Sequence, residues 1–204
     1  MKRYVPLFEE TGITLEMKNW FQKRTNYHIL LVQKYIDKII ELNNNDQLSK
    51  KLNNTILQKE KINHDQSKFQ EPELTPYVYI SWMYKCKDDG KEFILNSNQN
   101  QFMNNATNHH IKNNGHHPEY FDSSFISVPL KDRDSADVNY TVTAYKMTAS
   151  YIAVMVADWM AMSEEKGTNP FDWADKNINI RWKFHSNQRN FIYELLDKCW
   201  NKQV

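Results

Sequence analysis

The chain has 204 residues, of which 40% are hydrophobic, 13% aromatic and 25% charged. This is enough for one ordinary globular domain with a sizeable core, and it excludes a disordered tail or a mini-protein. Basic and acidic residues nearly balance, at 26 against 25, and no basic cluster is present, so we expect no nucleic-acid partner. No apolar run approaches the roughly 20 residues of a membrane-spanning helix, so we expect no membrane partner either.

The two cysteines, Cys86 and Cys199, are too few for a disulfide framework and fit a reduced compartment. The N-terminal segment starts with basic residues but has no apolar stretch behind them, unlike a secretion signal. We therefore predict a cytoplasmic protein.

Four glycines and six prolines leave few breaks in the chain, so helices should dominate. We predict an all-α, single-domain helical bundle over residues 25–204, preceded by an N-terminal extension over 1–24. The first predicted helix covers 25–42, where apolar residues recur at helical spacing from His28 and place this histidine towards the core. A more polar helix over 46–61 then leads to the adjacent pair His64 and Asp65.

The segment after the prolines at positions 72 and 76 is rich in aromatic residues, and we predict a helix there because its neighbours are helical. A loop over 87–100 follows, with room for a short hairpin around Asp89 and Gly90. The long polar connection over 122–145 is a candidate mobile flap. A helix over 148–163 carries Asp158 on its apolar stripe, a short helix starts after Asn169, and the last helix, from 186 or 187, is predicted to be purely structural.

Two histidine pairs, His109 with His110 and His116 with His117, lie in or just after a polar helix predicted over 101–114. Residues seven apart return to nearly the same side of a helix, so either His109 and His116 or His110 and His117 could face one point. The glycine and proline that flank the second pair predict, however, that the helix ends there.

Polar residues on apolar faces are the main indication of function. His28, Asp158 and the His64–Asp65 pair would each be costly to bury without a partner or a metal ion. Taken singly, His28 is more typical of a hydrogen-bonded core histidine than of a ligand, and Asp158 is more typical of a buried cap or salt-bridge partner. Six of the seven histidines occupy such suspicious positions, however, and imidazole with carboxylate suits zinc, iron, manganese or cobalt. The sequence therefore predicts a metal site.

The order of these residues resembles that of a known superfamily. His28, then the segment HDQSK at 64–68, then Asp158 within VADWMAM, is similar to the H, HD and D pattern of the HD-domain metal-dependent phosphohydrolases. The segment HHIKNNGHHPEYF, together with HDQSKF, further resembles an uncharacterised HD-related family of bacteria, phages and large DNA viruses. The resemblance covers the chain from about residue 27 to the end.

The resemblance implies an all-helical bundle of the HD-domain type that binds one or two divalent ions, of Mn, Fe, Co, Ni or Zn, with Mg also considered. It implies four ligands for the first ion: His28, His64, Asp65 and Asp158. In two-metal branches the aspartate of the HD pair bridges both ions, and His110 with His117 would then hold the second. Those branches separate their additional histidines by a longer stretch, so His109 with His116 stays an alternative.

The implied activity is hydrolysis of a phosphoester, most simply of a small nucleotide, by a metal-activated water. Lys68 is predicted to offset charge on the phosphoryl oxygens, unless it is only a solvated surface lysine. His116 or Glu119 is predicted to protonate the leaving oxygen. Several aromatic residues are candidates for stacking a base: Tyr77, Tyr79, Trp82 and Tyr120.

Two alternatives belong to other classes of protein. A histidine-rich second site suits a mixed-valent di-iron oxygenase of the same superfamily equally well. An HD scaffold can also bind or sequester a nucleotide without turnover. The glycine–tyrosine–proline segment of cyclic-dinucleotide phosphodiesterases is missing after the histidines, so that specificity is not expected.

Overall fold

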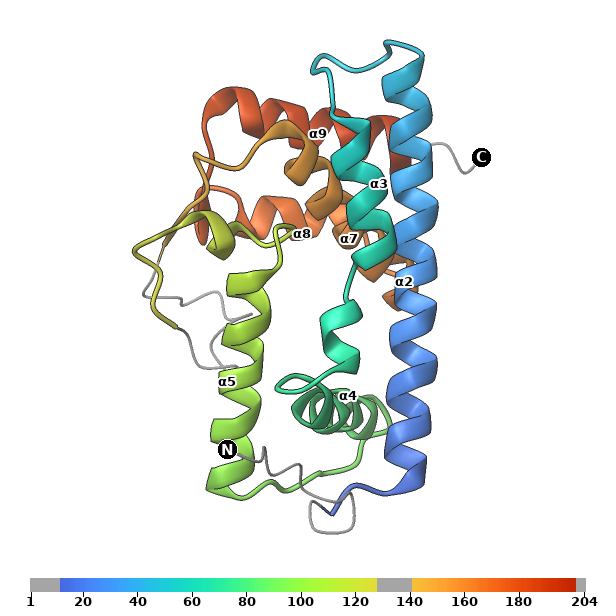
Figure 1. Cartoon of the computed structure of the whole chain (residues 1–204), viewed down its shortest axis with the longest axis vertical. Helices are drawn as coiled ribbons and strands as arrows, with labels where there is room; N and C mark the ends of the chain where they lie inside the picture. The colour runs from blue at the N-terminus through green and yellow to red at the C-terminus, as the bar shows by residue number, and fades with distance from the viewer. Residues whose placement is uncertain (1–11, 128–140, 201–204) are drawn as a thin grey trace.

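The computed structural model describes residues 12–127 and 141–200. Within these ranges seven α-helices form one bundle, as the sequence predicts (Figure 1). The helices are α2 (Leu15–Asn44), α3 (Asn54–Asn63), α4 (Leu74–Asp88), α5 (Ser97–Asn113), α7 (Ala149–Lys166), α8 (Pro170–Asn177) and α9 (Ser186–Trp200). Two 3₁₀ turns, η1 (Gln66–Phe69) and η2 (Pro118–Phe121), and two paired parallel strands, β1 (Val142–Thr143) and β2 (Trp182–Lys183), complete the described fold.

The helix α2 is longer than predicted, with 30 residues instead of the span 25–42. It begins after Thr14, whose side chain accepts a hydrogen bond from the Met17 backbone N–H at 3.2 Å and so caps the helix. Met17 and Phe21 are buried one turn apart. The boundary predicted at residue 24 therefore falls inside a continuous helix, because α2 begins at Leu15, ten residues before the predicted start at 25.

Side-chain caps explain most other differences from the prediction. The side chain of Asn53 accepts hydrogen bonds from the next turn, so α3 starts at residue 54 and not at 46. Asn96 and Gln99 form a reciprocal capping box that starts α5 inside the predicted loop. The predicted hairpin at Asp89 and Gly90 is wrong, because these residues form the turn that ends α4.

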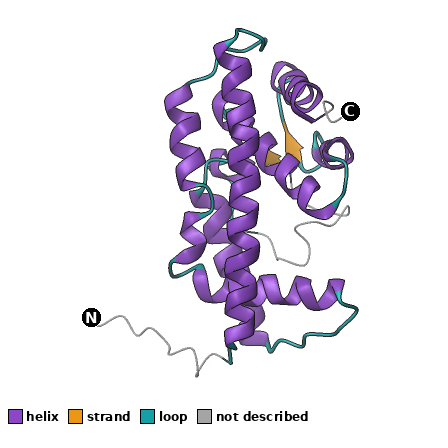
Figure 2. Cartoon of the chain, turned by 90° about the vertical axis from the view of Figure 1, so that its right-hand side faces the viewer, coloured by secondary structure: helices purple, strands orange, loops and turns teal. Residues whose placement is uncertain are grey.

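Two apolar cores lie along α2, which runs the full height of the molecule (Figure 1). The larger core lies between α2, α7 and α9 and includes Val32, Ile36, Met155, Ile192 and Leu195. The smaller core lies between the N-terminal half of α2, α4 and α5 and includes Met17, Phe21, Val78, Tyr79 and Met103. Figure 2 shows α2 as the common axis of these two parts.

The predicted structural role of the last helix is confirmed, because Phe191, Ile192, Leu195, Leu196 and Cys199 of α9 are all buried. Most of the predicted flap, residues 128–140, lies outside the described ranges. Among the described helices none is long and apolar enough to cross a membrane.

Candidate metal centre

Four side chains that are far apart in the sequence meet where α2, α3 and α7 pack together. His28 comes from the middle of α2, His64 and Asp65 follow the end of α3, and Asp158 comes from α7. We call His28, His64, Asp65 and Asp158 the first group. His28 Nε2 lies 2.9 Å from Asp158 Oδ1 and 3.8 Å from Asp65 Oδ2, and His64 Nε2 lies 3.6 Å and 3.9 Å from the same two oxygens. The structure thus brings together all four residues predicted for the first ion.

The end of α3 places two adjacent side chains in this group. His64 closes the helix as its C-cap, and Asp65 adopts a left-handed backbone conformation with φ of 58°. This conformation is uncommon for a residue other than glycine, and such backbone strain concentrates at functional sites. It turns the chain into η1, and His64 and Asp65 both stay buried at 1% exposure.

A second group of imidazoles lies beside the first. It consists of His110, in the last turn of α5, with His116 and His117 from the turn that follows. The ring centroids are 5.6 Å apart for His110 and His116, 5.0 Å for His110 and His117, and 4.2 Å for His116 and His117. Candidate ligand atoms of these three residues all lie within 4.8 Å of one another, so they could hold one ion.

A turn, and not a continued helix, returns the chain to His110. The helix α5 ends at Asn113, and the His117 backbone N–H donates to the Asn114 carbonyl at 3.1 Å. Gly115 lies against the Tyr151 ring, where an added Cβ would be 2.5 Å from Tyr151 Cε1. The two histidine pairs are therefore not brought together by a seven-residue repeat on one helix. The turn that brings them together depends on a glycine that allows close packing.

Asp65 connects the two groups because its two carboxylate oxygens face different histidines. Oδ1 lies 3.2 Å from His110 Nε2 and 3.8 Å from His116 Nε2. Oδ2 faces His28 and His64 at 3.8 Å and 3.9 Å. This is the arrangement that a carboxylate bridging two ions requires.

The donor atoms fit a metal. Within the described part of the chain, both ring nitrogens of His64, Nε2 of His110, Nδ1 of His116 and Oδ1 of Asp65 are buried without a hydrogen-bond partner. Buried polar atoms are nearly always satisfied, so these unpartnered atoms need an explanation. Bound cations would satisfy those that face Asp65, such as Nε2 of His64 and Nε2 of His110, because neutral imidazoles and carboxylates are the ligands of divalent transition metals.

The electrostatics keep Asp65 and His116 in metal-binding forms. Burial raises the pKa of Asp65, but the charges of Lys68 and His64 outweigh it and hold the pKa well below its usual range. Burial and the neighbouring His64 hold the pKa of His116 well below that of a free imidazole. Burial opposes protonation of His28, but hydrogen bonds to Asp158 and Glu165 raise its pKa to about 9. The carboxylate is thus ionised and His116 neutral, while His28 would release its proton on binding a metal.

Two outer carboxylates, Glu73 and Glu165, were missed by the sequence analysis. Glu165 Oε2 lies 3.5 Å from His28 Nδ1, and its Oε1 accepts a hydrogen bond from Arg24 Nε at 2.7 Å. Its spacing of seven residues from Asp158 on α7 was the available indication. Glu73 contacts His109 and His110 and is positioned by the start of α4, which no local pattern indicates.

Of the other residues predicted to belong to the site, Lys68 lies at the centre, whereas His109 and Glu119 do not. Lys68 Nζ donates to Asp65 Oδ2 at 2.6 Å, so Lys68 lies at the centre. The side chain of His109 is 43% exposed and contacts Glu73, so it is His110 that faces Asp65. The Glu119 carboxylate accepts a hydrogen bond from Trp182 Nε1 at 3.0 Å. Glu119 is thus part of the packing around β2, and its predicted role as proton donor loses support.

The fold and the site together define an all-α protein with a buried cluster of histidines and carboxylates. The chain belongs to the DUF5662 family, a family of unknown function, whose model matches residues 17–198. No curated protein and no solved structure matches the chain.

Proposed function

We propose that this protein is a metal-dependent phosphohydrolase that acts on a small phosphorylated metabolite, most simply a nucleotide. One observation carries the proposal: the buried carboxylate of Asp65 faces a histidine group with each of its oxygens. The resemblance of His28, the His64–Asp65 pair and Asp158 to the HD-domain pattern supports the same reading. We also propose a cytoplasmic location, in line with two free, buried cysteines.

The first group would hold one divalent ion, and the second group with Asp65 would hold another. His116 and His117 both belong to the second group, which makes His116 a better candidate ligand than a proton donor. A bound divalent ion supplies Lewis acidity and lowers the pKa of its water from about 15.7 towards about 7.

The side chains around the ions have separate tasks. Asp65 positions the attacking water by accepting its hydrogen bond. Lys68 lies on Asp65 and above the Tyr77 ring, with Nζ 4.9 Å from the ring centroid, where its charge offsets the negative charge of a phosphoryl group. Its side chain is only 18% exposed, which argues against a solvated surface lysine.

The aromatic residues predicted to stack a base are not equivalent. Tyr79 is 4% exposed and stacks on Phe93 in the smaller core, so it fills the core. Tyr120 is 48% exposed and lies on η2, three residues after His117. Tyr120 is therefore our candidate for contact with a base.

One observation favours a second candidate function, a mixed-valent di-iron oxygenase. The second group contains three histidines, and Asp65 is the carboxylate that faces Nε2 of His110 and Nε2 of His116. Such a nitrogen-rich site suits iron as well as a hydrolytic metal. The identity of the bound metal separates the two functions.

The test is elemental analysis of the full chain purified under argon without chelator, followed by a phosphatase assay on a panel of nucleotides. We expect about two ions per chain and release of phosphate. His64→Ala should lose both, whereas the matched variant His185→Ala should lose neither, because His185 is exposed and stacks on Tyr145. Two irons with oxygen uptake would favour the oxygenase. Binding of metal and nucleotide without turnover would identify a sequestering protein and contradict both enzymatic proposals.

A further inference from the structure

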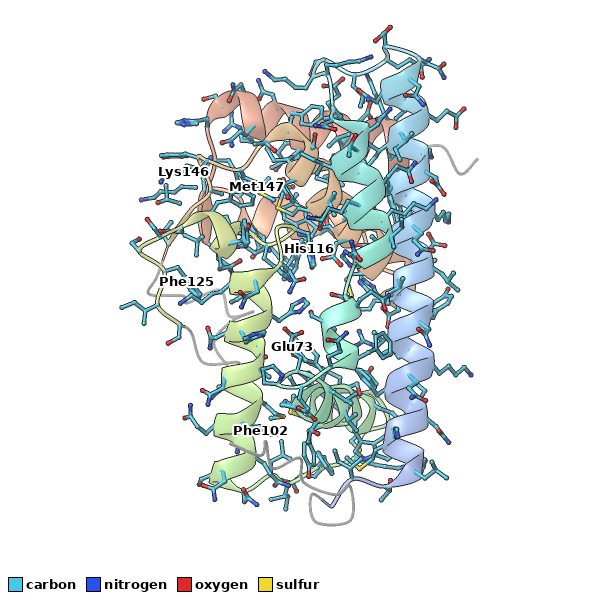
Figure 3. The ribbon with its side chains drawn as sticks, in the orientation of Figure 1. Glu73, Phe102, His116, Phe125, Lys146 and Met147 are labelled. Atoms are coloured by element: carbon cyan, nitrogen blue, oxygen red, sulfur yellow. The ribbon has the colours of Figure 1, made fainter. Side chains whose placement is uncertain are left out.

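Glu73 is a fully buried carboxylate directly behind the second group. It lies between η1 and α4, at 0% exposure, and accepts three hydrogen bonds of 2.8 Å. The donors are His109 Nδ1 to Oε1, and His110 Nδ1 and Ser67 Oγ to Oε2. Figure 3 shows Glu73 in the space between α5 and η1, below His116.

The charge of Glu73 is compensated differently from that of Glu165. Glu165 pairs with Arg24, which carries a permanent positive charge. Within residues 12–127 and 141–200, the ion-pair partners of Glu73 are His109 and His110, without a lysine or arginine. A buried carboxylate is costly without donors, so this one strongly favours the tautomers in which both histidines offer it an N–H.

We propose that Glu73 is a positioning residue, which keeps the proton of His110 on Nδ1 and so presents the Nε2 lone pair to a metal ion beside Asp65. This inference rests on the metal centre of the proposed function. It names a role for a residue outside both groups.

The geometry at His110 identifies its tautomer. A carboxylate can only accept, so the 2.8 Å contact with Glu73 requires the proton on Nδ1. The Asn114 amide also approaches Nδ1, at 3.1 Å, but it has another acceptor in the His110 carbonyl at 2.8 Å. Nε2 is then the ring nitrogen that faces Asp65 Oδ1, 3.2 Å away, and in the neutral ring it carries the lone pair that a metal ion would take. Two acceptors at this distance repel each other unless a cation, either a proton or a metal ion, lies between or beside them.

The contact with Glu73 also suggests a role for His109, which is not a candidate ligand in either group. His109 donates to Oε1 from the rim of the site, while His110 donates to Oε2 from the interior. The adjacent histidines are therefore not two ligands. One is a ligand, and the other helps to hold the carboxylate that orients it.

The test is titration of the metal-free full chain with Co²⁺, whose visible absorption reports its ligands. Replacing a carboxylate that orients a metal-bound histidine weakens binding by about 10- to 100-fold. We expect Glu73→Gln to weaken one of two binding events by this factor and to leave the other unchanged. Glu165→Gln should weaken the other event. Glu71→Gln is the matched control, since Glu71 is exposed and lies two residues away.

A second readout needs no metal, and its first part needs only the wild-type chain. Long-range ¹H–¹⁵N spectra of the metal-free wild-type chain should show His110 as the Nδ1–H tautomer, and Glu73→Gln should shift it towards a mixture. An Nε2–H tautomer in the wild-type chain would overturn the proposal, as would unchanged Co²⁺ affinities in Glu73→Gln. A chain that binds two ions but hydrolyses no phosphoester would refute the proposed function and leave this inference standing. A chain that binds no metal would refute both.

Discussion

The two groups of the candidate centre are held by different kinds of structure. Two members of the first group, His28 and Asp158, lie on α2 and α7, the helices that enclose the larger core, and the other two follow the end of α3, which packs against both helices. The second group is built on the last turn of α5 and on the turn after it. Its support is polar, from Glu73, and depends on the contact of Gly115 with Tyr151.

Because of this difference, we expect the two groups to respond differently to single substitutions. Apolar packing between long helices fixes the first group in the absence of any ligand, because moving it would open the core. Hydrogen bonds and a tight turn fix the second group, and single substitutions can disturb it without unfolding the bundle.

Asp65→Ala should have the largest effect, because both groups share this carboxylate. We expect loss of both ions and a fall in phosphatase activity of about 10³-fold or more. Elemental analysis and initial rates measure the two effects. Asp89→Ala, which removes an exposed carboxylate after α4, should keep metal and activity. Full metal occupancy in Asp65→Ala would contradict the bridging role.

Gly115→Ala should disturb the second group alone. The new Cβ would lie 2.5 Å from the Tyr151 ring, so the turn that carries His116 and His117 must shift. We expect the loss of one ion and a decrease in the free energy of unfolding of about 1–3 kcal/mol, measured by urea denaturation. Adding Tyr151→Ala removes the clash and should restore the ion. Loss of both ions from the single variant would show that the groups are not independent.

Lys68→Met should leave both groups filled and slow the reaction. The Lys68 ammonium donates to Asp65 Oδ2 at 2.6 Å and is our candidate for offsetting the phosphoryl charge, so its removal should lower kcat by about 10²-fold without changing metal content. Lys59→Met, at an exposed position of α3, is the matched control. If Lys68→Met lost metal in proportion to activity, Lys68 would be supporting Asp65 and not the substrate.

The smallest expected effect is a difference in the labelling rates of the two cysteines, which report local opening of the regions around the larger and the smaller core. Cys199 lies in the larger core on α9, and burial raises the pKa of its thiol to about 11. Cys86 lies near the end of α4, beside the smaller core, and is 8% exposed. We expect a thiol reagent to label Cys86 faster in the native protein and both equally in denaturant. Single-cysteine variants allow each thiol to be followed separately. Faster labelling of Cys199 than of Cys86 would contradict the expectation that the larger core opens less readily.

Local pattern predicted much of the fold and the first group. The helical spacing around His28 and Asp158 was sufficient because burial on one helix face is a periodic property of the sequence. Helix ends were predicted less well, because caps such as Asn53 and Asn96 act through one or two side-chain hydrogen bonds that leave no periodic pattern. The length of α2 was underestimated for a related reason, since its first turns are mostly polar around Met17 and Phe21.

The choice between His109 and His110 could not be made from the sequence, because both lie on one helix with equal chemistry. The approach to Asp65 decides it: His110 is buried with Nε2 3.2 Å from Asp65 Oδ1, whereas His109 is 43% exposed, and Asp65 is more than 40 positions away in the sequence. Glu119 is the converse case. It stands beside the histidines in the sequence, yet its carboxylate is taken up by Trp182 of β2.

By itself, the sequence determined the helical bundle and the kinds of ligand atoms, because side-chain chemistry and helical periodicity are local. Only the tertiary structure decided which imidazole nitrogens face Asp65, which carboxylates stand behind them, and which histidines stay at the rim. The physical reason is that the direction of a hydrogen bond depends on the position of a partner that the local sequence does not contain.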